Sequence, residues 1–282
     1  MSLVEMFHPE ITTIEQSLLN HFAEKAQLDH PGYSKLVESI TYSIESGGKR
    51  FRPLLSVLTA KALGKPLEQV LPVAMAVEFI HTYSLIHDDL PCMDDDDERR
   101  GKPTNHKVYG EATALLAGDA LLTESFLVVS QAYRQTPNIA TEVVWLLSEA
   151  AGLVGMVGGQ AMDMLVPKGG HNDEQIRWVH EMKTGALIRV SVEAAAVACA
   201  ATPHEREGLR KFADLLGFAF QLADDIDDFD AEAPENTSIV NVQGLEKTKQ
   251  QLVEVTDRCI KAVEGLNAKG LRAVAEFNRD RA

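Results

Sequence analysis

The chain has 282 residues, of which 45% are hydrophobic, so it can bury one large core or two modest ones, and we expect one domain over residues 1–282. Its formal net charge is −15, from 27 basic and 42 acidic residues. This excess argues against nucleic acid or an anionic membrane surface as a partner, because either polyanion would repel the protein. Places where basic residues do cluster therefore stand out.

The cysteines and residues 1–8 indicate in which cellular compartment the protein is expected. Cys92, Cys199 and Cys259 are far apart, odd in number and lack a CxxC spacing, which indicates free thiols in a reducing compartment and argues against zinc. Residues 1–8 contain no basic stretch leading into an apolar one, and no uncharged run approaches membrane-spanning length. We therefore expect a cytoplasmic protein without a membrane span.

The hydrophobic pattern predicts an all-α fold. From about Ile11 to Phe277, apolar residues recur at helical spacing, and strict alternation is scarce. Alanine and leucine, both strong helix formers, dominate residues 112–122 and much of 190–201. Short breaks that contain glycine or proline separate the expected helices, and none is a long linker. They fall at residues 46–48, 64–66, 100–103, 166–170 and 233–234.

The first chemically informative element along the chain is the turn at residues 47–53, Gly-Gly-Lys-Arg-Phe-Arg-Pro. It concentrates positive charge beside glycines in an otherwise acidic chain. Arginine forks and lysine point charges suit phosphate oxygens. Ordinary salt bridging is the alternative, and we favour anion binding for Lys49 and Arg52.

An apolar helix is expected next, ending in the acidic run at residues 87–98. Carboxylates as close as Asp88, Asp89 and Asp94 repel one another unless a cation neutralises them, and oxygen ligands suit a hard ion such as Mg²⁺. A regular helix would place Asp88 and Asp94 on different faces. Pro91 should end or distort the helix, which would let Asp94 turn back toward Asp88. A solvated acidic turn is the alternative.

Two neighbours of this motif carry positive or titratable groups. Arg99 and Arg100 follow it directly and are candidates for binding an anion, although salt bridges to the adjacent aspartates are a plausible alternative. His81 precedes Asp88 by seven residues, which is two helical turns on the same face, so it could extend the polar site. A lone histidine is more often a core residue, and only the alignment of His81 with Asp88 makes us favour a role in the site.

A second acidic cluster lies farther along the chain, after a lysine and a hydroxyl at Lys183 and Thr184. Asp224 and Asp228 have i, i+4 spacing and share a helix face, where like charges destabilise the helix unless a cation lies between them. Gln221 precedes this cluster by about one turn. A solvated face is again the alternative, but two clusters that each need a cation favour a shared metal site.

Together with Gly158-Gly159-Gln160, these motifs resemble the polyprenyl synthase family in both order and spacing, over nearly the whole chain. The four residues between Asp89 and Asp94 are similar to those of bacterial farnesyl diphosphate synthases. The resemblance implies an isoprenoid synthase-type antiparallel helical bundle around a central cavity, usually a homodimer, with both acidic motifs at the mouth. It also implies head-to-tail condensation of isopentenyl diphosphate with an allylic diphosphate.

Residue roles carried over from matching motifs are likewise implied by the resemblance. The Mg²⁺ ligands would be Asp88, Asp94 and Asp224, with Asp89 and Asp228 in support. Isopentenyl diphosphate would be held by Lys49, Arg52, His81 and Arg100. The allylic diphosphate would be held by Arg99, Lys183, Thr184 and Gln221. Those expected to act in catalysis, by stabilising charge on the leaving diphosphate, are Lys183, Arg99 and Arg100.

Product length should depend on the helix residues before Asp88. Tyr83 lies beside Ser84, about one turn earlier. The resemblance suggests that Tyr83 helps to form a floor that stops growth at farnesyl length, and simple core packing is the alternative.

The chain departs from the family after the second motif. Residues 229–240 contain no glycine or lysine, Glu235 stands where the family has a lysine shortly before the threonine at Thr237, and Asp227 occupies a commonly apolar position. Two alternatives therefore stay open: a weakly active or non-catalytic subunit of a prenyl synthase complex, and a class I terpene cyclase. A cyclase, however, does not need the isopentenyl-binding Lys49 and Arg52.

Overall fold

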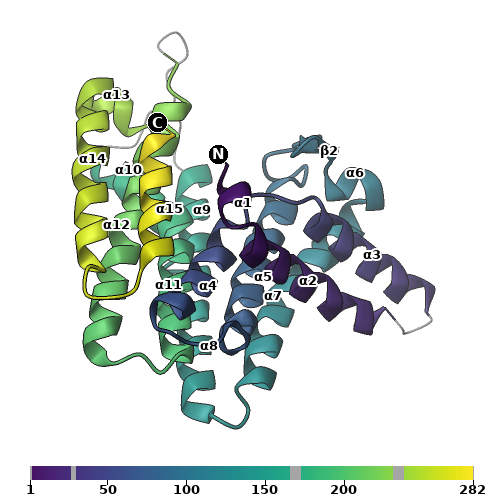
Figure 1. The fold of residues 1–282 in the computed structure, drawn as a ribbon. Helices are drawn as coiled ribbons and strands as arrows, with labels where there is room; N and C mark the ends of the chain where they lie inside the picture. The colour runs from purple at the N-terminus through teal and green to yellow at the C-terminus, as the bar shows by residue number, and fades with distance from the viewer. Residues whose placement is uncertain (1, 27–29, 166–172, 231–237, 282) are drawn as a thin grey trace. The chain divides into compact units, whose positions relative to one another are not determined.

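The computed structural model describes residues 2–26, 30–165, 173–230 and 238–281. Within these ranges the chain is helical apart from one short hairpin, which confirms the predicted all-α class (Figure 1). The chain divides into two compact units, Met1–Leu54 with Leu71–Ala140 and Leu55–Val70 with Thr141–Ala282, and each is described by itself. The expectation of one domain over residues 1–282 stays a prediction.

The first unit is organised around two long apolar helices that pack along each other, α5 (Leu71–Asp88) and α7 (Glu111–Ala132). A Cβ atom on Gly118 of α7 would lie only 2.0 Å from Nε2 of His87, so the missing side chain lets α7 pass close to the end of α5. The remaining elements of this unit are α1 (Leu3–Met6), α2 (His8–Lys25), α3 (Pro31–Glu45), β1 (Glu98–Arg99), β2 (Lys102–Pro103) and α6 (Asn105–Tyr109).

The second unit is organised around α12 (Pro203–Asp227), its longest described helix, which lies beside α14 (Leu245–Ala262) and α15 (Lys269–Asp280) (Figure 1). Thr202 and Glu205 begin α12 with a capping box, in which each side chain accepts a hydrogen bond from the other residue's backbone N–H. Fully buried Phe212 and Leu216 fill its inner face. The other helices of this unit are η1 (Leu67–Gln69), α9 (Met156–Leu165), α10 (Asp173–His180), η2 (Glu181–Gly185), α11 (Ala186–Ala198), α13 (Ile239–Gln243), α14 (Leu245–Ala262) and α15 (Lys269–Asp280).

Two further helices, α4 (Phe51–Ala62) and α8 (Pro137–Ala151), begin in the first unit and end in the second. The predicted breaks at residues 46–48, 64–66 and 100–103 are confirmed, since no helix runs through them. The breaks at 166–170 and 233–234 fall within residues that the structure does not describe. All three cysteines are free, as predicted, with Cys92 exposed and the other two buried.

Two segments are long and apolar enough to cross a membrane by length and composition alone, Glu111–Ala132 and Pro137–Met164. The first is the core helix α7 of the first unit, and the core helices of water-soluble proteins meet the same criteria. The second is interrupted between α8 and α9. Neither segment indicates a membrane span.

Candidate active site

The first aspartate motif turns back on itself directly after α5. The helix ends at Asp88, and the backbone N–H of Asp94 donates a hydrogen bond of 2.9 Å to the carbonyl oxygen of Asp88. Asp95, with a φ of 54°, closes the turn by donating its N–H to the carbonyl of Leu90 at 3.2 Å. This fold-back confirms the prediction made from Pro91, and it brings the backbones of Asp88 and Asp94 together.

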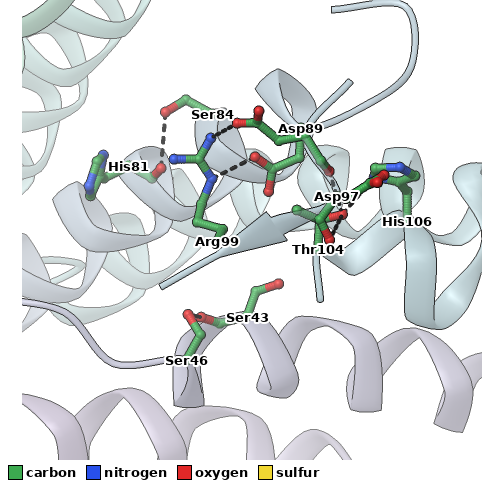
Figure 2. Close-up of polar contacts among 10 residues, drawn as sticks. Ser43, Ser46, His81, Ser84, Asp89, Asp97, Arg99, Thr104 and His106 are labelled. Carbon is green, nitrogen blue, oxygen red and sulfur yellow. Dashed lines mark hydrogen bonds and ion pairs between the residues drawn. The ribbon is translucent and has the colours of Figure 1, made fainter. Parts of the chain in front are cut away.

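Asp89 lies on the buried side of this motif and binds Arg99. Its side chain accepts a 2.5 Å hydrogen bond from Nε of Arg99, whose Nη2 donates to Asp96 at 2.9 Å (Figure 2). Burial raises the pKa of Asp89, and the charge and hydrogen bond of Arg99 oppose that rise. Salt bridging, the alternative for Arg99, is therefore present. Its allylic diphosphate role and the metal role of Asp89 stay predictions.

The tight hairpin of β1 and β2 points the side chains of Arg99 and Arg100 in different directions. Strands β1 and β2 pair Arg99 with Lys102, and the two intervening residues, Arg100 and Gly101, have φ of 55° and 76°. Positive φ at both central residues is the signature of a type I′ turn, which suits the twist of a two-stranded hairpin. Arg99 thus points to the aspartate motif, while Arg100 donates a hydrogen bond to the carbonyl of Gly47.

The basic turn at residues 47–53 requires its glycines. Gly48 has a φ of 122°, which strains any other residue, and a Cβ there would lie 2.7 Å from Cζ of Arg100, so the guanidinium would have to move aside. Lys49 is exposed. The structure therefore brings the two predicted isopentenyl diphosphate ligands Lys49 and Arg100 to one turn.

The turn is anchored from inside by Arg50, a residue for which no role was predicted. Arg50 has a φ of 47° and is buried, and its Nη1 lies 2.7 Å from Oε1 of the equally buried Glu78. It also donates to Glu15 at 3.4 Å and to the carbonyl of Ile44 at 2.5 Å. Glu78 is the only acidic residue of the apolar α5 before its final Asp88, and this was the available signal, because a buried carboxylate needs a partner.

His81 and Arg52, both predicted to bind isopentenyl diphosphate, lie next to each other. Nη1 of Arg52 donates to Nε2 of His81 at 3.4 Å, which assigns the ring proton to Nδ1. Burial, and then the charges of Arg52, Arg100 and other nearby arginines, hold the pKa of His81 well below its ordinary value. The ring is therefore neutral. Arg52 and Arg100 lie near it, and Lys49 belongs to the turn that Arg100 contacts. Lys49, Arg52, His81 and Arg100 are together called the basic cluster.

Tyr83 is buried in α5, and its ring meets that of His87 edge-on at 5.7 Å between centroids. Burial and then the charge of Asp88 raise the pKa of Tyr83 to about 12, so the phenol stays neutral. Its burial fits the core-packing alternative, and its role as a cavity floor stays a prediction. Ser84, beside it, donates to the carbonyl of His81 at 2.9 Å (Figure 2).

In the second unit, Lys183 and Thr184 lie on η2, a single π-helical turn between α10 and α11. Such turns are frequent at functional sites. Nζ of Lys183 is held by Asp163 of α9 at 2.6 Å. A Cβ on Gly159 would lie 2.3 Å from the backbone nitrogen of Lys183, which explains the glycine in the Gly158-Gly159-Gln160 motif as a close contact between α9 and η2.

The second aspartate motif occupies the last turn of α12 in the same unit. Asp225 accepts the N–H of Ile239 at 2.6 Å and so helps to begin α13. Asp228, the C-cap of α12, is exposed. Asp224 and Asp227 both contact Arg281, at 2.5 and 2.9 Å. Glu235 and Thr237, where the chain departs from the family, lie outside the described residues.

Gln221, a turn earlier on α12, is buried and lines a cavity of about 240 Å³ with residues of α10, η2 and α11. The same cavity is lined by His180, Gly185 and Arg189. The structure thus brings Gln221 and the π turn of Lys183 and Thr184 to neighbouring positions in the second unit. Their contact with an allylic diphosphate stays a prediction.

Both motifs offer oxygen donors, the ligand type that a hard divalent cation prefers. Among the described residues, no group of three or more acidic, histidine or cysteine side chains is already gathered as a metal site. The second motif nevertheless holds a cation, the Arg281 guanidinium, against two of its carboxylates. This observation fits a cation-binding motif. The two motifs belong to different units, so their meeting at one site stays a prediction.

Known proteins are similar to this chain over most of its length. The polyprenyl synthetase family model matches residues 33–241. A farnesyl diphosphate synthase of Geobacillus stearothermophilus is 45% identical over 80% of this chain and 76% of its own length, and one of Bacillus subtilis is 48% identical over 77% and 73%.

Solved structures share the fold. An FPP/GFPP synthase from Zymomonas mobilis, solved in its apo form, has a TM-score of 0.89 and 37% identity, and the match covers 98% of this chain and 99% of that one. A geranyltransferase from Legionella pneumophila has a TM-score of 0.88 and 27% identity, covering 99% and 98%. These matches confirm the isoprenoid synthase fold class expected from the motifs, and the chain belongs to the polyprenyl synthetase family.

Proposed function

We propose that the chain is a Mg²⁺-dependent short-chain prenyl diphosphate synthase that joins isopentenyl diphosphate to dimethylallyl or geranyl diphosphate, with farnesyl diphosphate as its product. The observation that carries the proposal is the basic cluster of Lys49, Arg52, His81 and Arg100 beside the folded-back aspartate motif. Similarity to farnesyl diphosphate synthases over about three quarters of both chains supports the same reaction.

The basic cluster suits isopentenyl diphosphate, whose diphosphate carries several negative charges. Arg52 and Arg100 offer planar forks, and Lys49 offers an exposed point charge. His81 stays neutral, so its Nδ1–H can donate to a phosphate oxygen without adding a charge to those of the arginines around it. This arrangement would fix the double bond of the substrate in place for attack on the allylic carbon.

We assign the allylic diphosphate to cationic residues from both units, Arg99 beside the first aspartate motif and Lys183 in the unit of the second. Arg99 is fixed by Asp89 and Asp96, and Lys183 by Asp163, so each cation is already oriented before a substrate arrives. Such preorganised charges stabilise the negative charge that develops on the leaving diphosphate. They need no reorganisation at the moment of bond cleavage.

Asp88, Asp94 and Asp224 would hold Mg²⁺, with Asp89 and Asp228 in support. When bound, the ion supplies further positive charge to the departing diphosphate oxygens. Loss of a proton after carbon–carbon bond formation completes the reaction, and the departing diphosphate is the base that the family resemblance suggests. Asp89 serves this site chiefly by holding Arg99, since its carboxylate is buried on that side.

We further propose a cytoplasmic homodimer. Leu115 and Leu116 of α7 are exposed by 47% and 56%, and contact with a second copy would remove this apolar surface from water. Analytical ultracentrifugation would test this point, and a monomer at all concentrations would contradict it.

The synthase and the two alternatives considered from the sequence predict different outcomes of one assay. Purified protein should be incubated with labelled isopentenyl diphosphate and with dimethylallyl or geranyl diphosphate, with Mg²⁺ or with EDTA. Chain elongation that requires Mg²⁺ supports the synthase. Cyclised hydrocarbon from the allylic substrate alone would establish the cyclase, and no turnover would establish the non-catalytic subunit.

A matched pair of variants sharpens this test. Asp94→Asn removes a proposed metal ligand, whereas Asp95→Asn removes an exposed carboxylate from the next position of the same turn. Asparagine tolerates the positive φ of Asp95. Elongation should fall about a hundredfold or more in the first variant, as is typical for a lost charge-stabilising group, and only slightly in the second. Equal losses would refute the ligand assignment.

A further inference from the structure

Arg281, directly after α15, is placed against the second aspartate motif with its whole guanidinium engaged. Nη2 lies 2.5 Å from Oδ1 of Asp224, and Nη1 lies 2.9 Å from Oδ2 of Asp227. Nε donates to Oδ1 of Asn278 at 3.1 Å, and Nη2 also donates to the carbonyl of Phe220 at 3.2 Å. The guanidinium carbon stands 4.8 Å from the centre of the Phe220 ring.

These contacts hold the guanidinium in a defined, largely buried position, unlike a pairing of two exposed side chains. The Arg281 side chain is only 15% exposed, and Asn278 beneath it is buried. A planar cation stacked on an aromatic ring and bridging two carboxylates satisfies the geometry that guanidinium groups prefer. All of these groups lie in the second unit.

The charge of the motif explains why a cation is needed there. Asp224, Asp225, Asp227 and Asp228 place like charges on the last turn of α12, which is also the negative end of the helix dipole. Asp225 is engaged by the N–H of Ile239. Arg281 supplies a full positive charge to two of the others, so it stabilises the motif when no metal ion does.

We propose that Arg281 is the resident counter-cation of the second aspartate motif, and that it competes with a divalent cation for Asp224. This inference rests on the proposed function, because it takes Asp224 as a metal ligand. The oxygen of Asp224 that accepts the Arg281 hydrogen bond faces the guanidinium, and a divalent cation at the same oxygen would be repelled by it. Metal binding therefore displaces Arg281 from Asp224.

Asp227 can keep the Arg281 side chain near the motif after Arg281 has left Asp224. It holds the other Nη group of Arg281. The guanidinium can therefore give up Asp224 and stay near the site through Asp227 and the Phe220 ring. The exchange makes Arg281 a positioning residue that tunes the affinity of the motif for its metal ion.

The test measures binding of Mn²⁺ alone to the intact chain, from the electron paramagnetic resonance signal of free Mn²⁺, and needs no turnover. Asp224→Asn identifies the binding that depends on the second motif. Arg281→Ala should tighten that binding between about threefold and thirtyfold, as expected from the loss of two partly exposed ion pairs. Arg281→Lys, which keeps the charge without the fork, should fall between Arg281→Ala and the unaltered chain.

The control is Arg279→Ala, which removes the same charge two residues earlier, from a side chain that pairs with Asp280 instead. It should leave Mn²⁺ affinity unchanged. Equal affinity in Arg281→Ala and Arg279→Ala, with binding still lost in Asp224→Asn, would overturn the competition and leave the proposed function standing. Unchanged binding in Asp224→Asn would overturn both.

Displacement of Arg281 from Asp224 can also be measured in the unaltered protein. Saturating Mg²⁺ should speed amide hydrogen exchange of the final turn of α15, because that turn then loses the Arg281–Asp224 contact with α12 and keeps only those to Asp227 and Phe220. The same addition to Asp224→Asn should have no such effect. Equal exchange rates with and without Mg²⁺ in the unaltered chain would contradict displacement.

Discussion

Replacing Glu78 with glutamine tests how the substrate-binding turn is held. Glu78 and Arg50 are each only 3% exposed at the side chain, and their closest atoms lie 2.7 Å apart. Removing one charge of a fully buried pair leaves the other uncompensated, which typically costs about 3–5 kcal/mol. The free energy of unfolding should therefore fall by about that amount, and the thermal midpoint by roughly 5–8 °C for a chain of this length.

The matched control is Glu15→Gln. Glu15 also contacts Arg50, but at 3.4 Å and with a side chain that is 42% exposed. Because exposed ion pairs contribute little, this variant should lose less than about 1 kcal/mol. Urea unfolding followed by circular dichroism measures both variants. If Glu78→Gln and Glu15→Gln lost the same small amount, the buried pair would not be the anchor of the turn.

The same variant should affect binding of one substrate more than the other. Arg50 lies between Lys49 and Arg52 in the chain, so loosening it should raise KM for isopentenyl diphosphate. KM for geranyl diphosphate, assigned to other residues, should change less. Steady-state kinetics with each substrate varied in turn measures this split, and equal rises would count against the assignment.

Three further predictions follow from single positions. Gly48→Ala should cost about 1–3 kcal/mol of stability, because its φ of 122° suits only glycine, whereas Gly265→Ala, which meets open space, should be nearly neutral in the same urea titration. Gly159→Ala should push α9 away from Lys183 and lower kcat, measured with saturating substrates; unchanged kcat would contradict the close contact. Burial depresses the pKa of His81 below its ordinary 6.5, so the folded state binds fewer protons than the unfolded one. Stability is then full above pH 6.5 and is lost as the pH falls through the folded-state pKa, a dependence that should be weaker in His81→Gln across roughly pH 5–7.

Local features of the site could be predicted from the sequence because their causes are local. Pro91 and the spacing of the aspartates were enough to predict that α5 ends there and that Asp94 turns back toward Asp88. Helical periodicity likewise predicted that His81 lies on the face of α5 that leads to Asp88. These inferences use only neighbours within a few turns of the chain.

Other features depend on residues far apart in sequence, and no pattern pointed to them. Arg281 meets Asp224 across 57 residues, and its position is fixed by how α15 packs on α12. Lys183 and Asp163 meet through a π-helical turn, an irregularity without a periodic signal. For Glu78, the sequence could have predicted that a basic partner exists, because a buried carboxylate in an apolar helix needs one. It could not have predicted which basic residue this partner is.

The most direct test of the shared metal site is a crystal structure with Mn²⁺ and a non-reactive allylic diphosphate analogue. Anomalous scattering should place metal ions at roughly 2.1 Å from carboxylate oxygens of both Asp88 and Asp224, on one bound diphosphate. Metal peaks at only one of these aspartates, or a diphosphate bound away from both, would contradict the account.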